Sequence, residues 1–403
     1  MPEIPQNPNS IHPVGWSPET QWAGIQAGEH LDFVRIYQEQ RERAPVAWRS
    51  FEDGQGFWCV FNHADVARVL DDPTTFSSAK PKYGLTLIPI EVDPPDHRKY
   101  RQLLGQLINT ARLKRMEDDI RNFVRAELQQ LKDGKIDLLT LTAAIPVQSF
   151  CQMVSDPNPE GFRALHLARE AANDPRLARF DETSVAKRVA ANQPLADYCT
   201  RMIAEHRVAP RDDIVSDILA GVVDGRPISD QEAHSMLSLL YIAGSRTTTA
   251  ALRGSLVQLL RVPHLLERLR ADPSLIPAAI EEIVRLESPV HGLPRYATTD
   301  VEIAGQEIAK GEQVFPNYGA ANVDPAVFQN PGEIDLDRRP VRHVGFGRGI
   351  HICAGAPLAR MQMRVFLQEL TASVSGILST GEPITRMTWP HYGATALPAR
   401  LEW

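Results

Sequence analysis

The chain contains only four cysteines, and no two of them are close in the sequence. Cys59, Cys151, Cys199 and Cys353 show neither the C-x-x-C spacing of a zinc ribbon nor the dense spacing of a disulfide framework. Because disulfides are rare in reducing compartments, a chain of this kind is expected in the cytoplasm.

Long apolar runs and excess positive charge are also absent. No segment reaches the ~18 apolar residues of a transmembrane helix, so no membrane span is expected. The net charge of −7 argues against non-specific binding to nucleic acid. Residues 1–25 are polar and proline-rich, unlike a signal peptide, and we expect extended chain there. Since no composition shift marks a linker, we expect a single domain over residues 1–403.

Hydrophobic periodicity predicts a mostly α protein with small β-sheets. Residues 46–61 alternate in polarity and are expected to turn at Asp53-Gly54, which is typical of a hairpin. Residues 298–315 predict a second set of hairpin strands. Helical patterns cover the remaining long segments, among them 63–72, 93–105, 113–135, 185–207 and 278–290.

The longest predicted helix covers residues 229–262. Ser229 and Glu232 form a capping-box pattern at its start, and Pro263 ends it. Its middle, "AGSRTTTA", contains Gly244 and three threonines, although a glycine costs about 1 kcal/mol relative to alanine inside a helix. A ligand that approaches closely would explain this composition, and a kinked core helix is the alternative.

Two pairs of charged residues have helical spacing. Glu282 and Arg285 are three residues apart in a mainly apolar segment, a spacing that usually gives a solvated surface pair. His97 and Arg101 lie four apart on one helix face. Two such donors suit an anion such as a carboxylate, whereas a basic helix in water is the simpler interpretation.

Cys353 lies in the glycine-rich stretch "RHVGFGRGIHICAGAPLARMQ", residues 342–362. A lone cysteine is most often buried and inert. A nucleophile paired with His351 would need a strand-to-helix elbow that is absent, and a zinc site would need further ligands at suitable spacing. A loop of small residues that leads into a helix can instead stabilise a thiolate, which is the axial ligand that some haem irons use.

These residues resemble the signature motifs of the cytochrome P450 family, in particular its soluble bacterial members. The haem-binding motif F-x-x-G-x-[R/H]-x-C-x-G is matched by Phe346, Gly349, His351, Cys353 and Gly355. The E-x-x-R motif is matched by Glu282 and Arg285, and the resemblance adds Arg338 as their third partner. The resemblance thus implies an internal charge cluster that supports the cysteine loop, in place of a surface pair. The matches follow the order of the family from about residue 30 to the C-terminus.

The resemblance implies the cytochrome P450 fold, a triangular prism of helices. Haem b would lie between the central helix 229–262 and the loop of Cys353, which would bind the iron. The family's haem propionates are held by residues that match His97, Arg101, Arg295 and His351. The other implied haem contacts are Ala243, Gly244, Phe346, Gly349 and Gly355.

The implied activity is that of a haem-thiolate monooxygenase. It would insert one oxygen atom from O2 into a small, mainly apolar substrate, by hydroxylation or oxidative demethylation. A separate ferredoxin, served by an NAD(P)H-dependent ferredoxin reductase, would supply electrons to the enzyme, which is expected to be a monomer. Basic residues on the cysteine side are expected to steer this partner, namely Arg98, Lys99, Arg112, Lys114 and Arg348.

Thr247 matches the family's distal hydroxyl, which steers the protonation of dioxygen. The residue before it is usually acidic, but here it is Arg246, and residues 233–266 contain no Asp or Glu. Arginine stays protonated at neutral pH and is not a proton shuttle. Arg246 could pair with an acid in 169–183, could bind a substrate carboxylate as in a carboxylic-acid hydroxylase or an H2O2-using peroxygenase, or could have no catalytic role. A haem-thiolate sensor without turnover is the remaining alternative.

The resemblance also implies the walls of the substrate pocket. They are small, aliphatic and lightly polar, which suits a compact apolar molecule. Tyr83 and His291 are able to orient a substrate oxygen, although any of these side chains could instead be core and His291 could equally bond the backbone. The remaining pocket residues are Leu85, Leu87, Leu240, Val290, Leu293, Ala394 and Thr395.

Overall fold

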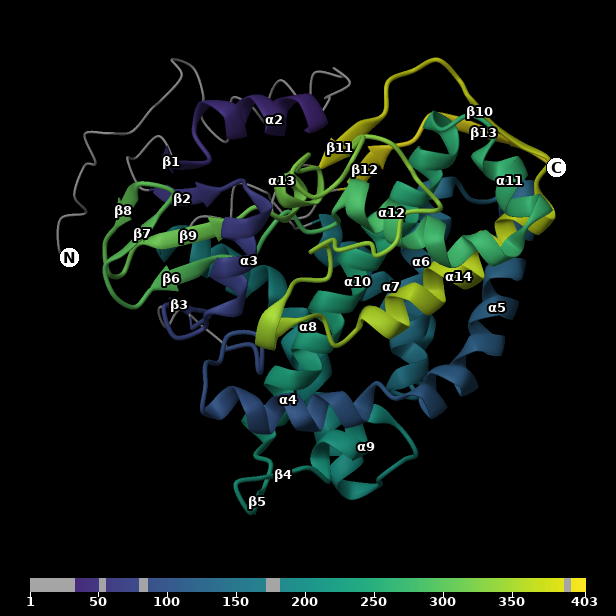
Figure 1. The fold of residues 1–403 in the computed structure, drawn as a ribbon. Helices are drawn as coiled ribbons and strands as arrows, with labels where there is room; N and C mark the ends of the chain where they lie inside the picture. The colour runs from purple at the N-terminus through teal and green to yellow at the C-terminus, as the bar shows by residue number, and fades with distance from the viewer. Residues whose placement is uncertain (1–32, 51–55, 80–85, 172–181, 388–392) are drawn as a thin grey trace.

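The five-stranded sheet lies at one side of the molecule, and most of the helices lie at the other (Figure 1). The computed structural model of the protein describes residues 33–50, 56–79, 86–171, 182–387 and 393–403. Helices make up most of these residues, and the strands form one five-stranded sheet and four pairs. The predicted class, mostly α with small β-sheets, is therefore confirmed.

Fifteen helical segments are described, two of them short 3-10 turns. The extended segment predicted for residues 1–25 lies outside the described residues. In chain order the segments are α2 (Phe33–Arg43), α3 (His63–Asp71), α4 (Asp96–Leu107), α5 (Thr110–Lys132), α6 (Leu138–Met153), α7 (Pro159–Ala171), α8 (Glu182–Val208), α9 (Ile214–Leu219), α10 (Asp230–Arg261), α11 (Leu265–Ala271), η2 (Pro273–Leu275), α12 (Ile276–Glu287), α13 (Tyr318–Asn322), η3 (Gly349–His351) and α14 (Ala356–Ser373).

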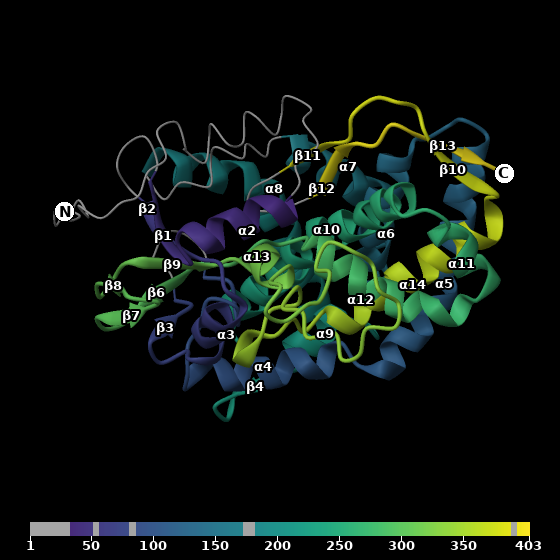
Figure 2. The same ribbon diagram turned by 45° about the horizontal axis from the view of Figure 1, so that its top comes forward.

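The larger sheet has the strand order β1-β2-β9-β6-β3. Figure 2, turned by 45°, shows it again at the end of the molecule opposite to α5 and α11. The described strands are β1 (Val46–Ser50), β2 (Gly56–Val60), β3 (Phe76–Ser77), β4 (Val222–Val223), β5 (Arg226–Pro227), β6 (Arg295–Ala297), β7 (Val301–Ile303), β8 (Gln306–Ile308), β9 (Gln313–Pro316), β10 (Gly376–Ser379), β11 (Thr385–Met387), β12 (Gly393–Ala396) and β13 (Ala399–Glu402).

Both predicted hairpin regions contain paired strands. β1 and β2 pair antiparallel, while the predicted turn at Asp53-Gly54 lies outside the described residues. In the second region, β7 and β8 form the hairpin. β9 instead joins the larger sheet, parallel to β2 and antiparallel to β6, because its residues Val314 and Phe315 are buried on both faces.

α10 is the long helix predicted from the sequence. The capping box of Ser229 and Glu232 is present, and the helix ends two residues before Pro263. It runs uninterrupted through "AGSRTTTA", where Thr249 Oγ1 donates to the carbonyl of Ser245 at 2.9 Å. α10 packs against α6, α8, α12 and α14, and a helix that is apolar on most sides is expected to be buried in this way.

The main core joins α4, α5, α6, α10, α12 and α14 around shared apolar residues. A second cluster fills the space between the larger sheet and α3. Among the described residues, no helix combines the length and hydropathy that a membrane span requires. The packing of the core places α10 and the start of α14 as the two fixed supports of the site described next.

Candidate functional site

The loop that carries Cys353 is held in a fixed turn by glycines and backbone bonds. The N–H of Cys353 donates to the carbonyl of Phe346 at 2.8 Å, which closes the loop. Gly347 and Gly349 have φ angles of 71° and 68°, a region that favours glycine. A Cβ on Gly349 would lie 2.3 Å from the carbonyl oxygen of Leu70, so this loop can approach α3 only without a side chain there.

The Cys353 thiol is free and has an exposed surface, while the other three cysteines are buried. The chain nevertheless crowds the remaining sides of the sulfur, and this burial raises the pKa of the Cys353 thiol. Backbone N–H groups of Gly355 and Ala356 at the start of α14 oppose the rise, as do the charges of Arg101 and Arg360. The predicted backbone donors are thus present. A metal cation bound to the sulfur would add the positive charge that stabilises the thiolate form.

Glu282 forms a buried charge cluster that is linked to the start of this loop through Asn322, which accepts from Arg285 and from the N–H of Val344. Arg285 donates to both carboxylate oxygens of Glu282 at 2.8 Å, and Arg338 Nε donates at 3.1 Å. Arg285 is fully buried and also donates to three backbone carbonyls between residues 322 and 333. The interpretation as a solvated surface pair is therefore wrong, and the contact with Arg338 implied by the resemblance is present.

A second carboxylate on α12, Glu281, holds the cysteine loop more directly. Arg360 of α14 donates to its two oxygens at 2.6 and 2.8 Å, and His343 Nε2 lies 3.1 Å away. The guanidinium of Arg360 also lies 4.3 Å from the ring centroid of Phe346. Burial raises the pKa of Glu281, but Arg360 and His343 outweigh it and lower that pKa to about 2. Sequence reasoning missed this cluster, since no local spacing links its members.

The four expected propionate donors lie together, although they come from three elements. His97 and Arg101 lie on α4, Arg295 on β6 and His351 in η3. The rings of His97 and His351 meet edge to face with their centroids 4.5 Å apart. The pKa of His351 is lowered to about 3 by burial, with further lowering by Arg295, His97 and Arg101. Burial also lowers the pKa of His97. Arg101 and Arg295 make the cluster electropositive.

This cluster contains buried polar atoms that the described protein does not satisfy. The Nε2 atoms of His97 and His351 are buried, and neither has a hydrogen-bond partner among the described residues. A buried donor without an acceptor destabilises a fold, so such atoms call for a partner. Carboxylates next to Arg101 and Arg295 would accept these bonds. The residues present therefore fit the two propionates of a haem.

The middle of α10 has an open face. Leu240, Tyr241 and Ser245 are buried, but Ala243 is exposed and Thr247 is half-buried. A Cβ added to Gly244 would meet nothing within 4 Å. An exposed patch in an otherwise buried helix indicates space for a ligand, which is the first of the two interpretations of "AGSRTTTA". Thr247 Oγ1 donates to the carbonyl of Ala243 at 2.6 Å, and its lone pairs remain able to accept.

Arg246 is half-buried and immediately precedes Thr247 on α10. Residues 172–181, most of the range in which an acidic partner was one possibility, lie outside the described residues.

The expected pocket residues are placed as follows, with Tyr83 and Leu85 lying outside the described residues. Ala394 and Leu240 are buried, and Thr395 is exposed. Three aliphatic members are half-buried: Leu87, Val290 and Leu293.

His291 does not lie where the sequence analysis expected it. Its Nδ1 is 2.8 Å from the hydroxyl of Tyr37, and its ring packs against Phe33 of α2 and beneath Gly319 of α13. Burial lowers its pKa to about 3. None of these neighbours is an expected pocket residue, so His291 is a core histidine and the expectation that it orients a substrate was wrong.

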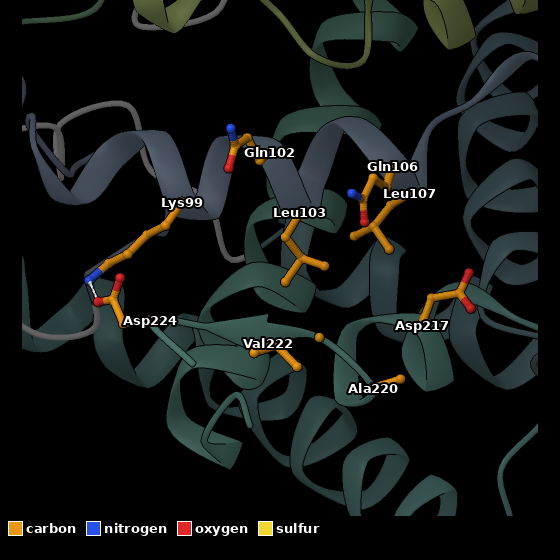
Figure 3. Close-up of a pocket in the computed structure, with 10 residues that line it drawn as sticks. Lys99, Gln102, Leu103, Gln106, Leu107, Asp217, Ala220, Val222 and Asp224 are labelled. Atoms are coloured by element: carbon orange, nitrogen blue, oxygen red, sulfur yellow. Dashed lines mark hydrogen bonds and ion pairs between the residues drawn. The ribbon is translucent and has the colours of Figure 1, made fainter. Parts of the chain in front are cut away.

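A groove of about 740 Å³ lies elsewhere, between α4 and the segment of α9 and β4 (Figure 3). Lys99 and Asp224 form an ion pair across one end, and Leu103 and Val222 face each other in the middle. The groove contains none of the expected haem or substrate residues. We therefore do not assign it as the haem or substrate site, although it is large.

The basic residues expected to steer a partner are only partly available. Arg112 is buried, and donates to Asp217 at 2.5 Å and to a backbone carbonyl at 2.8 Å. Lys99 and Arg348 form ion pairs. Arg98 and Lys114 remain exposed. The expectation for Arg112 was wrong, because its guanidinium is used inside the fold.

Replacing Arg101 with glutamine should speed haem loss. A charge-assisted hydrogen bond contributes about 1.5–3 kcal/mol, so we expect haem to leave about tenfold faster or more. Transfer of haem to excess apomyoglobin measures this rate. Arg98→Gln is the matched control, since Arg98 lies exposed on the same helix. Equal rates in both variants would remove Arg101 from the haem contacts.

Comparisons with known proteins agree with this geometry. The family model described as "Cytochrome P450" matches residues 163–373. The linalool 8-monooxygenase of Pseudomonas putida is 32% identical and aligns over 84% of this chain and 88% of its own length. The methyl-branched lipid omega-hydroxylase of Mycobacterium tuberculosis is 31% identical over 94% of this chain and 95% of its own.

A solved structure extends the similarity to the fold. CYP108D1 from Novosphingobium aromaticivorans superimposes with a TM-score of 0.82 at 29% identity, and the match covers 94% of this chain and 96% of that one. The matched lengths exceed two thirds of every chain compared. The chain therefore belongs to the cytochrome P450 family and is a haem monooxygenase with the fold of that family.

Proposed function

We propose that this P450 inserts one oxygen atom from O2 into a small, mainly apolar organic substrate, by hydroxylation or oxidative demethylation. We further propose that haem b is the cofactor and that a separate ferredoxin delivers the electrons. One observation carries the proposal: the exposed Cys353 thiol lies beside a buried cluster whose His97 and His351 Nε2 atoms have no partner in the described protein. A haem bound by its iron and by its propionates would satisfy both features.

Haem supplies the redox chemistry, and electron donation from a thiolate ligand favours O–O cleavage of dioxygen. Cys353 is the ligand in this proposal. Its loop is fixed by the bond to Phe346 and by the Glu281–Arg360 pair, so the sulfur keeps one position. His97, Arg101, Arg295 and His351 hold the propionate edge.

In this proposal, α10 provides space for O2 and a hydroxyl group that can transfer a proton. Ala243 and Gly244 would leave room for O2 beside a bound haem, because neither presents a side chain larger than a methyl group. Thr247 can accept a hydrogen bond while it donates to Ala243, which suits a hydroxyl that orders a water and passes its proton on. Arg246 does not replace the acid in this proposal, since arginine side chains are not proton shuttles.

The substrate class follows from the pocket residues that the structure describes. Leu240, Ala394 and the half-buried Leu87, Val290 and Leu293 are aliphatic. With His291 in the core, these residues offer few polar groups to a ligand, which favours a compact apolar molecule. The relative named linalool 8-monooxygenase supports this size and polarity.

Reconstitution tests the proposal directly. With ferredoxin, an NAD(P)H-dependent reductase and O2, we expect oxygenated product from substrates that shift the ferric spin state on binding. Hydrogen peroxide alone should support only slow turnover. Efficient peroxide turnover without electron partners would make the protein a peroxygenase, whereas a carbon monoxide complex without product from any donor would make it a sensor.

The second candidate, a carboxylic-acid hydroxylase or peroxygenase, rests on the position of Arg246 next to Thr247. If Arg246 binds a carboxylate, an Arg246→Asp variant should keep its haem and lose affinity for acids by about tenfold or more, the effect of a lost charge-assisted bond. Titration of the ferric spin state with a fatty acid and with its methyl ester measures how much of the ligand affinity comes from the carboxylate charge and how much from the shape of the ligand. Equal affinities of both ligands for the natural chain would exclude this role.

A further inference from the structure

The C-terminal hairpin β11–β12 is a two-stranded sheet. Arg386 of β11 pairs with Ala394 of β12, and the register shifts between Thr385 and Arg386. Two-stranded hairpins are marginally stable on their own, so this one needs contacts that fix it to the rest of the fold. Because Ala394 and Thr395 are proposed pocket residues, the position of the hairpin bears on the width of the pocket.

Glu287, the last residue of α12, anchors β11. It is 3% exposed. Arg386 Nη1 donates to its Oε2 at 2.5 Å, and Gln258 Nε2 of α10 donates to its Oε1 at 2.5 Å. The side chain lies flat on α10 because Gly254 leaves room, since a Cβ there would be 2.7 Å from Glu287 Cγ. One carboxylate thus joins α12, α10 and the hairpin.

Arg253 anchors the other strand. Its Nη1 donates to the carbonyl of Ala394 at 2.9 Å, and its Nη2 donates to the carbonyl of Leu139 at the start of α6 at 3.2 Å. β12 also touches α10 directly, since a Cβ on Gly393 would lie 2.9 Å from the Cβ of Ala250. Ala250 is three residues after Thr247, so both strands are tied to the helix that carries the open face.

Glu287 also lies close in the chain to Val290, another proposed pocket residue. Glu287 is followed by Ser288 in a left-handed conformation, with φ of 38°, and then by Pro289 and Val290. The bonds of Glu287 and Arg386 given above involve neither the cysteine loop nor the propionate cluster. A change at this ion pair should therefore act first on the pocket walls, because none of these bonds reaches the haem contacts directly.

We propose that Glu287 and Arg386 are specificity-determining positioning residues. Their ion pair fixes the hairpin β11–β12 against α10 and so sets the width of the substrate pocket. The inference rests on the proposed function only in that the hairpin borders the substrate. The ion pair itself is nearly desolvated, with side chains 10% and 4% exposed, and such pairs hold one geometry because breaking them leaves an uncompensated charge.

Two azoles that bind ferric haem iron through a ring nitrogen test this. The affinity of imidazole depends mainly on its bond to the iron, whereas the affinity of 4-phenylimidazole also depends on contacts of its phenyl ring with the pocket walls. In Arg386→Met and in Glu287→Gln, we expect the Kd of 4-phenylimidazole to rise about tenfold and that of imidazole to stay within about twofold. In the double variant, the Kd of 4-phenylimidazole should rise by less than the product of the two single-variant increases. Arg400→Met is the matched control, since Arg400 belongs to an exposed pair on β13.

An equal rise for both azoles would mean that the haem site itself had moved, and no rise for either would mean that the pair does not set the wall. Either result overturns the proposal. If Arg386→Met fails to retain haem, Arg386→Lys keeps the charge with fewer donors, and the same preference for the smaller azole is expected with a lesser effect. Azole binding needs no substrate, ferredoxin or turnover, so an error in the proposed function would not mimic a negative result.

Discussion

Cys353→Ala should yield a protein with little pigment. The thiolate is the proposed bond to the iron, and loss of even a residue that supports a metal ligand costs 10- to 100-fold in affinity, so we expect haem content to fall by about tenfold or more. The propionate cluster of His97, Arg101, Arg295 and His351 would remain, but it holds only the edge of the cofactor. Haem content per protein after hemin supplementation measures the effect.

Two companion variants make this result specific. Cys199→Ala removes a buried thiol on α8 and should keep full pigment. Cys353→His offers the iron a nitrogen ligand, so any haem that binds should lack the red-shifted carbon monoxide band of a thiolate complex. Full pigment and an unchanged carbon monoxide spectrum in Cys353→Ala would show that this sulfur is not the ligand.

The local motifs of the site could be predicted because their geometry is determined by neighbours in the chain. Gly347 and Gly349 have positive φ angles that favour glycine, and Cys353 closes its loop onto Phe346 seven residues earlier. Glu282 and Arg285 share one helix face at i and i+3. Such features recur wherever the same local structure occurs, so a short sequence motif is enough to predict them.

Contacts between segments that are distant in the sequence were harder to predict. Glu281 and Arg360 are far apart in sequence and meet only because α12 packs beside α14. Nothing in the sequence distinguishes Glu281 from a surface residue next to Glu282. Arg338 was paired with Glu282 through the resemblance alone, and no spacing rule would have linked the two residues.

The errors have a common physical origin. His291 and Arg112 were assigned to a pocket and to a surface because polar side chains usually serve one or the other. In the structure, His291 binds the hydroxyl of Tyr37, and Arg112 binds Asp217 and a backbone carbonyl. A polar residue can be buried wherever a partner meets it, and the partner depends on tertiary packing that the pattern of one segment does not show.

Glu282→Gln should strongly destabilise the fold. Removing one member of a buried charge pair leaves the other uncompensated and costs about 3–5 kcal/mol. Arg285 has 0% exposure and would keep its charge without its carboxylate. Urea unfolding should show a lower midpoint. Arg35→Gln, which breaks an exposed pair with Glu39, should cost at most about 1 kcal/mol.

The pH dependence separates charge from packing in this cluster. Burial raises the pKa of Glu282, but Arg285 and its other partners outweigh this effect, so the folded-state pKa lies below its usual value. A carboxyl whose pKa is lowered on folding stabilises the fold above its unfolded pKa of about 4.3, and that stability is lost as the pH falls through the folded pKa. The stability gap between the natural chain and Glu282→Gln should therefore be widest near neutral pH and should close on acidification. A gap that is constant with pH would mean that the substitution acts through packing, and no gap at neutral pH would mean that Glu282 does not support the fold.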